Sequence, residues 1–154
     1  MSGVKRLRPV ERLMRQQQEQ AAADLARAQG ELQRSEGQLT SILGMRQEYQ
    51  QRLVTSGTSG TIEAARLRDF NAFLGRLDEA VAQQRQGIAE QQQRVVQLHQ
   101  RWLQHWEAHR RIERVIEQRL DQERSAAQRR EQREADETAR LFFQSARRRS
   151  SDSE

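Results

Sequence analysis

Apolar residues recur along positions 66–120 in alternating steps of three and four, which places them in two rows with a seven-residue repeat. One row is Leu67, Leu74, Val81, Ile88, Val95, Trp102, His109 and Ile116, and the other is Phe70, Leu77, Gln84, Gln91, Leu98, His105 and Ile112. Together the rows form one narrow stripe along a helix, as in a coiled coil, rather than the wider apolar face of a helix in a globular domain. A stripe this narrow predicts a second helix packed against it.

A weaker pattern of the same kind covers the first third of the chain. One row is Leu7, Met14, Ala21, Ala28, Ser35, Ile42 and Tyr49, and its partner row is Leu25, Leu32, Leu39, Arg46 and Leu53. We interpret the small residues in these rows as positions where two helices approach closely. The pattern predicts a first helix over residues 10–54. Residues 1–9 form a short basic start, in which Pro9 suits the first turn of the helix.

A short segment of Ser, Thr and Gly, residues 55–61, separates the two patterns. We expect Gly57 to end the first helix in the left-handed conformation, and Ser59 or Thr61 to cap a second helix over residues 62–145. A loop this short makes the two helices antiparallel neighbours. The predicted fold is therefore all-α, a two-helix antiparallel coiled-coil hairpin.

The two helices of this hairpin are predicted to be unequal in length. Pairing outward from the loop places Tyr49 near Leu67 and Leu7 near His109. Past the end of the first helix, the rows of the second continue with charged and small residues, so the second helix overhangs the first. We expect residues 146–154, which are rich in arginine and serine, to form a disordered tail.

Composition favours a pair of helices over a globular domain. Apolar residues make up 34% of the chain and charged residues 32%, whereas typical domains are about 45–50% apolar and 25% charged. The net charge is +5, but acidic residues are interleaved with the arginines, which favours a solvated helix surface over a nucleic-acid site. The most basic segments follow the apolar rows, unlike the basic region of a leucine-zipper DNA-binding protein.

The sequence shows no feature of an integral membrane protein. No apolar run approaches the roughly 18–20 residues of a membrane span, and the N-terminus lacks the apolar core of a signal peptide. The absence of cysteine fits the cytosol. We therefore expect a soluble protein, at most peripheral to a membrane.

Candidate catalytic and metal-binding residues are few. His105 and His109 lie one helical turn apart, which is a spacing of metal ligands, but both fall in the apolar rows, so we interpret them as polar interface positions. Gly57 and Gly60 lack the Gly-Lys-Ser/Thr ending of a phosphate-binding loop. Two paired helices offer no pocket that excludes water. We expect no metal, no cofactor and no enzymatic activity.

Two groups of apolar side chains exceed what the stripe can bury. Near the loop, four residues cannot all point at the first helix: Phe70, Phe73, Leu74 and Leu77. The resulting patch favours a docking site for a partner, and the alternative is that Phe73 wraps around the helix interface. The second group, residues 141–143, has no partner in the predicted hairpin.

Two segments that flank the loop carry a more specific pattern. They are Tyr49-Gln-Gln-Arg-Leu53 and the run from Phe70-Asn-Ala-Phe73 to Arg85. This pattern resembles the FliJ family of flagellar type III export proteins, and the two-helix plan covers nearly the whole chain. The basic opening from Val4 to Leu7 is also similar to the injectisome counterpart of the family, so an injectisome stalk protein is the alternative.

The resemblance implies a stalk protein, an antiparallel hairpin similar to the gamma subunit of rotary ATP synthases. Its paired end is expected to enter the central hole of the hexameric export ATPase and to stimulate it. Its loop side is expected to meet the cytoplasmic domain of the membrane-embedded export gate. Export chaperones are further implied partners, and the implied location is the cytoplasm, at the cytoplasmic face of the inner membrane.

The resemblance also assigns residues to the gate contact, and the sequence suggests others for the ATPase ring. The gate residues are Phe73, Leu77, Ala80 and Tyr49, together with Gln84, where the family often has His. From the charge pattern we assign the ring contact to four arginines, Arg110, Arg111, Arg114 and Arg119. A general coiled-coil scaffold without a link to an ATPase is the competing function.

Overall fold

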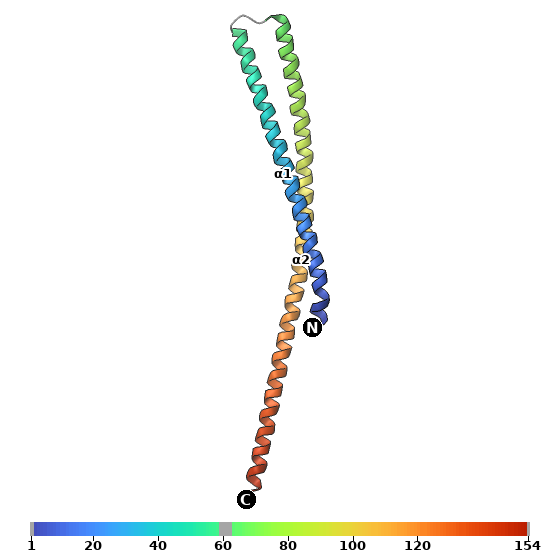
Figure 1. Cartoon of the computed structure of the whole chain (residues 1–154), viewed down its shortest axis with the longest axis vertical. Coiled ribbons are helices and arrows are strands. Elements are labelled where there is room, and N and C mark those ends of the chain that lie inside the picture. Colours follow the sequence, from blue (N-terminus) through green and yellow to red (C-terminus); the bar gives the residue numbers. More distant parts are fainter. Residues whose placement is uncertain (1, 59–62, 154) are drawn as a thin grey trace. The chain divides into compact units, whose positions relative to one another are not determined.

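The structure, a computed structural model, describes residues 2–58 and 63–153. Within them it contains two helices, α1 over Ser2–Thr58 and α2 over Ala64–Ser151, and no strand (Figure 1). The predicted all-α fold, with two helices packed against each other, is confirmed. Neither helix, over its described residues, combines the length and the apolar character that a membrane crossing requires.

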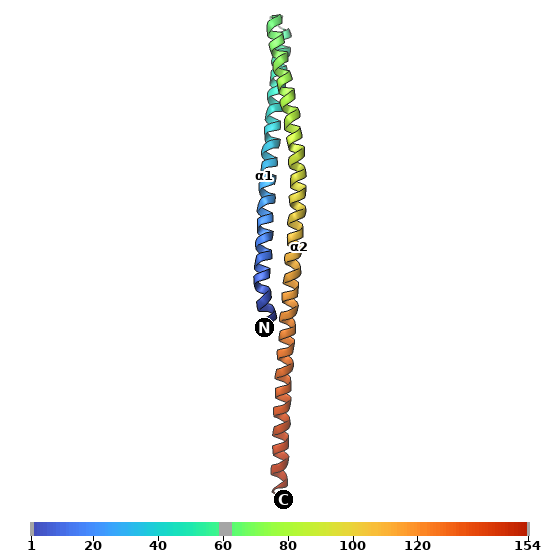
Figure 2. The same cartoon turned by 90° about the vertical axis from the view of Figure 1, so that its right-hand side faces the viewer.

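The chain divides into two units, each built from a piece of both helices. One unit comprises residues 17–105, where α1 and α2 run antiparallel and side by side in both views (Figures 1 and 2). The other comprises residues 1–16 and 106–154. In this second unit the start of α1 packs on α2, and nearly every residue of α2 after Ala126 is exposed. The predicted overhang of the second helix is therefore present.

The predicted rows form the interface between the helices. In residues 17–105 the buried side chains all belong to these rows: Ala21, Ala28, Leu77, Val81 and Ile88. In the other unit the buried side chains are Val4, His109 and Ile116. In the two rows of α2, only Leu67, next to the start of the helix, is exposed. Seven-residue periodicity therefore identifies the residues that hold the helices together.

The first helix starts earlier than predicted. α1 begins at Ser2 rather than Val10, so the basic start at residues 1–9 is helical. Pro9 lies inside the helix, where it removes one backbone hydrogen bond. The burial of Val4 against α2 favours the helical conformation on the N-terminal side of the proline and offsets that loss.

The first helix also ends later than predicted. It extends to Thr58, so residues 55–58 of the predicted loop are helical, and Gly57 lies within the helix instead of forming its left-handed end. The hydroxyl of Thr55 donates to a carbonyl one turn back, at 2.9 Å, a bond that satisfies a hydroxyl group inside a helix. Two predicted caps fall outside the described residues: Ser59 and Thr61.

The second helix extends through most of the predicted tail. α2 begins at Ala64, and residues 146–154, predicted to be disordered, are helical up to Ser151. Arginine is a strong helix former, and the hydroxyl of Ser150 donates to the carbonyl of Arg147 at 2.9 Å. Since no glycine or proline occurs in this segment, nothing local ends the helix earlier.

The pairing of the helices differs from the predicted register by about one helical turn. His109 faces Glu11 rather than Leu7, and Tyr49 packs on Phe70.

Candidate functional site

An aromatic cluster, composed of Tyr49, Phe70 and Phe73, joins the two helices near the loop. The ring of Tyr49 in α1 lies 4.7 Å from that of Phe70 and 4.4 Å from that of Phe73, measured between centroids. Such aromatic pairs contribute about 0.5–1.5 kcal/mol beyond the area they bury. Phe73 is half-buried, so it packs across the interface and also presents part of its ring at the surface. The guanidinium of Arg76 lies 6.0 Å from the centroid of that ring.

Leu77 and Ala80 differ in how far their side chains are buried. Leu77 is 7% exposed and belongs to the interface with α1, so its side chain supports the surface near the loop rather than forming it. Ala80 is half-buried. Of the five residues predicted for the gate contact, Leu77 alone is buried, and Tyr49, Phe73, Ala80 and Gln84 are each partly exposed.

Gln84 is held by the first helix. Its Nε2 donates to the carbonyl of Ser35 at 2.9 Å and to Oε1 of Gln38 at 3.1 Å. Towards the loop, the guanidinium of Arg46 donates to Asp78 at 2.6 Å. These polar contacts cross between the helices and favour one register of pairing, because another register leaves the same groups unpaired.

A groove lies between the helices beside the aromatic cluster. Its lining is Gln47, Gln50, Gln51, Leu53, Val54, Thr55 and Leu74. The lining combines three glutamines with three apolar side chains and one threonine, a mixture suited to contact with a protein surface.

The four arginines predicted to contact the ATPase ring do not all share one environment. Arg110, Arg111 and Arg114 are exposed, and the guanidinium of Arg110 lies 5.6 Å from the ring centroid of Trp106. Arg119 is turned toward the start of α1, where a Cβ atom added to Gly3 would lie 2.9 Å from its Nη1. All four arginines are therefore exposed, and Arg119 differs from the other three in lying against the start of α1.

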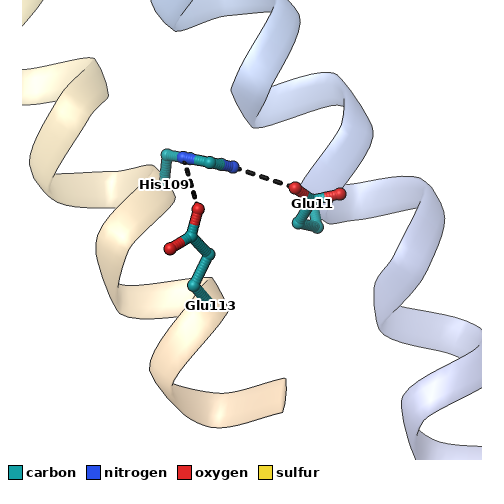
Figure 3. Close-up of side chains that lie close together, drawn as sticks. All are labelled: Glu11, His109 and Glu113. Atoms are coloured by element: carbon teal, nitrogen blue, oxygen red, sulfur yellow. Dashed lines mark hydrogen bonds and ion pairs between the residues drawn. The ribbon is translucent and has the colours of Figure 1, made fainter. Parts of the chain in front are cut away.

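A polar cluster that the sequence analysis missed lies in the unit formed by residues 1–16 and 106–154. It consists of Glu11 on α1 with His109 and Glu113 on α2 (Figure 3). Nε2 of His109 lies 3.0 Å from Oε1 of Glu11, and Nδ1 lies 3.1 Å from Oε1 of Glu113. The side chains of His109 and Glu11 are only 10% and 12% exposed, and that of Glu113 is 38% exposed. We call these three residues the histidine clamp.

The signal for this cluster was present in the row of Leu25. Continuing that row toward the N-terminus in steps of seven gives Gln18, Glu11 and Val4, and all three are covered by α2 to some degree. Two polar residues, Gln18 and Glu11, separate the predicted row from Val4. A polar residue in a coiled-coil row is a common way to fix register, so the interruption itself was informative.

The arrangement of the histidine clamp suits hydrogen bonds better than a shared metal ion. Ionised carboxylates only accept hydrogen bonds, so a ring that faces one on each nitrogen satisfies both when it is doubly protonated. A metal ion bound by all three residues needs both carboxylates beside the same ring nitrogen, whereas here they face different nitrogens (Figure 3). His105, the other histidine considered as a ligand, is not a member of this cluster.

Several neighbouring groups favour the ionised form of Glu11. The hydrogen bond from His109 is the largest cause that holds the pKa of Glu11 below its ordinary value of 4.5, and the positive charges of Arg15, His109 and Arg8 act in the same direction, against an opposing effect of burial. The second oxygen of the carboxylate, Oε2, accepts from Nη2 of Arg15 at 3.3 Å. Glu11 is therefore held in its ionised form, as the clamp requires.

Comparison with known proteins agrees with the resemblance found near the loop. The family model described as Flagellar FliJ protein matches residues 3–148 of the 154-residue chain. A search of curated proteins and a search of solved structures gave no match. Because the match runs through both helices and both units, this chain belongs to the flagellar FliJ protein family.

Proposed function

We propose that this chain is a non-enzymatic stalk and adaptor of the flagellar type III export apparatus, one that inserts into the export ATPase ring, stimulates it and links it to the export gate and to export chaperones. The observation that carries the proposal is the family match over residues 3–148. The family supports a role related to flagellar export, and the two-helix hairpin is the fold that such a stalk needs.

The overhang of α2 supports an insertion role. After Ala126 the helix carries almost only exposed side chains, so its entire circumference is available to surrounding subunits. A single helix presents a different side chain in each direction, and it therefore contacts each subunit of a ring differently. Such contacts favour one subunit conformation over another only through differential affinity for the two states.

The surface near the loop supports the proposed gate contact. Phe73 and Ala80 present partly exposed apolar groups, the groove beside the aromatic cluster adds further surface, and Leu77 holds this part of α2 against α1. Gln84 and Tyr49 contribute by fixing the relative positions of the helices. In this proposal the gate binds a preformed surface, and a preformed surface loses less conformational entropy on binding.

The exposed arginines support the proposed ring contact. Arg110, Arg111 and Arg114 form a basic surface on α2, which attracts an acidic ring entrance and increases the association rate. Arg119, which lies beside Gly3, is assigned a supporting role at the start of α1. The proposed location is the cytoplasm, at the cytoplasmic face of the inner membrane, where both partners are found.

The direct test is the ATPase activity of the cognate export ATPase with and without the purified chain. We expect the chain to increase the rate of ATP hydrolysis under conditions in which the ATPase forms its ring. An unchanged rate under those conditions contradicts the stalk function. Affinity capture of the ATPase by the full chain separates this outcome from the competing function of a general scaffold, which has no link to the ATPase.

A further inference from the structure

The start of α1 is joined to α2 by few buried groups, and the histidine clamp is central among them. In this unit Val4, His109 and Ile116 are the buried side chains among the described residues. Two of them are apolar and contribute at any pH. The third is a histidine whose two ring nitrogens face Glu11 on α1 and Glu113 on α2 (Figure 3). One of the buried side chains between α1 and α2 in this unit is therefore a titratable group in contact with two carboxylates.

The hydrogen bonds of the clamp require a specific protonation state. With both ring nitrogens protonated, His109 donates to both carboxylates, and its positive charge is balanced on both sides. When one proton is lost, one nitrogen becomes an acceptor that faces a carboxylate oxygen, so that contact changes from attractive to repulsive. Histidine is the side chain that ordinarily changes its charge between about pH 5 and 8.

We propose that Glu11, His109 and Glu113 form a proton-dependent clamp that holds the first turns of α1 against α2 and loosens as His109 loses a proton. Loosening uncovers the apolar surface of Val4 and Ile116, which then becomes available to another helix. The inference does not depend on the proposed export function, because it concerns only the attachment of α1 to α2 within the isolated chain.

Charged groups from both helices lie around His109. The ring of His109 contacts Glu11 from α1 and Glu113 from α2. Around these two carboxylates lie Arg8 and Arg15 on α1 and Glu117 on α2. The two carboxylates in direct contact with the ring are the nearest of these charges, and both are negative. The arginines contact or approach Glu11 rather than the ring, and they keep that carboxylate ionised.

The test is amide hydrogen exchange of the full chain between about pH 6 and 8.5, corrected for the intrinsic pH dependence of exchange. The loss of one charge-assisted hydrogen bond predicts that protection of residues 3–16 falls about tenfold over this range. In His109→Gln, protection should be lower at pH 6 and nearly independent of pH. The matched control is His99→Gln, at an exposed histidine in the other unit, which should keep the pH dependence of the original chain.

Two results overturn the proposal. One is protection of residues 3–16 that is constant with pH in the original chain, and the other is an unchanged pH dependence in His109→Gln. If that variant does not fold, nitrogen NMR of the His109 ring in the original chain decides the question. Two ring N–H groups at pH 6, one of which is lost together with the protection, support the clamp, whereas a singly protonated ring at pH 6 contradicts it.

Discussion

Tyr49 of α1 and Phe73 of α2 pack against each other with ring centroids 4.4 Å apart and ring planes inclined at 46°. Phe73 is also the central residue of the proposed gate contact, so in that proposal one side chain serves both the helix interface and partner binding. Leu77, one turn further along α2, is buried in the interface. Separate substitutions at these two positions therefore distinguish effects on binding from effects on stability.

Phe73→Ala is expected to weaken binding of the cytoplasmic domain of the export gate by about tenfold or more, because aromatic side chains dominate many interfaces. The loss of folding free energy should be about 1–2 kcal/mol, less than the roughly 3–5 kcal/mol of a phenylalanine truncated in a core, since this ring is only half-buried. Titration calorimetry measures the first effect, and thermal unfolding followed by circular dichroism measures the second. Phe142→Ala removes a 67% exposed ring in the other unit and serves as the control, which should bind the gate normally. Equal affinity of the Phe73 variant and the original chain contradicts the assignment.

Leu77→Ala is expected to act mainly on stability. A buried leucine truncated to alanine loses about 2–5 kcal/mol, and a lower value in this range applies here because the interface is only two helices thick. The comparison variant is Leu103→Ala, at a leucine of α2 that is 38% exposed and lies outside the rows. Chemical denaturation should show a clearly lower unfolding free energy for the Leu77 variant. If the two variants unfold alike, Leu77 is not part of the interface.

The position of the interface could be predicted from the sequence because periodicity reports directly which side of a helix is covered. Ala21 and Ala28 were predicted to allow close approach, and both are buried. The helix ends could not be predicted in the same way. Gly57 is compatible with a helix end and with a helix interior, so the residue type alone does not decide where α1 ends.

The histidine clamp shows why the site residues were harder to predict than the fold. Its members come together only if the register is known to within one turn, and the predicted register placed Leu7 where Glu11 lies. The residues near the loop present the same difficulty, because periodicity does not decide how a crowded apolar segment divides between interface and surface. The structure places Leu77 inside and leaves Leu67 exposed.

Acid pH should destabilise the attachment of α1 through Glu11. Because the folded-state pKa of Glu11 lies below its ordinary value of 4.5, its contribution to stability is fully present above that value and is lost as the pH falls through the folded-state pKa. Thermal unfolding should therefore show a loss of stability in this acid range that is smaller in Glu11→Gln. The variant should start from a lower stability at neutral pH, since it lacks the charged acceptor of the clamp. Parallel pH profiles of the two proteins contradict the role of this carboxylate.

The exposed arginines of α2 are expected to act on the rate at which the chain meets the ATPase ring. In the double variant Arg110→Glu with Arg114→Glu, the association rate at low salt should fall about tenfold, because steering by charge is reversed. The control is Arg66→Glu with Arg68→Glu, which makes the same charge change at two exposed positions near the loop. Surface plasmon resonance at increasing salt measures both pairs.

The salt dependence separates steering from direct contact. If the arginines act only by steering, the association rates of the double variant and the original chain should converge near about 0.5 M salt. At that concentration the electrostatic screening length falls to a few ångströms. A deficit that persists at high salt indicates a contact within the complex, and an equal effect of the control pair shows that net charge alone is responsible. Arg119→Glu should behave differently from both pairs. Because the side chain of Arg119 lies beside Gly3, this substitution should mainly increase hydrogen exchange at the start of α1. Its effect on the association rate should be the smaller one.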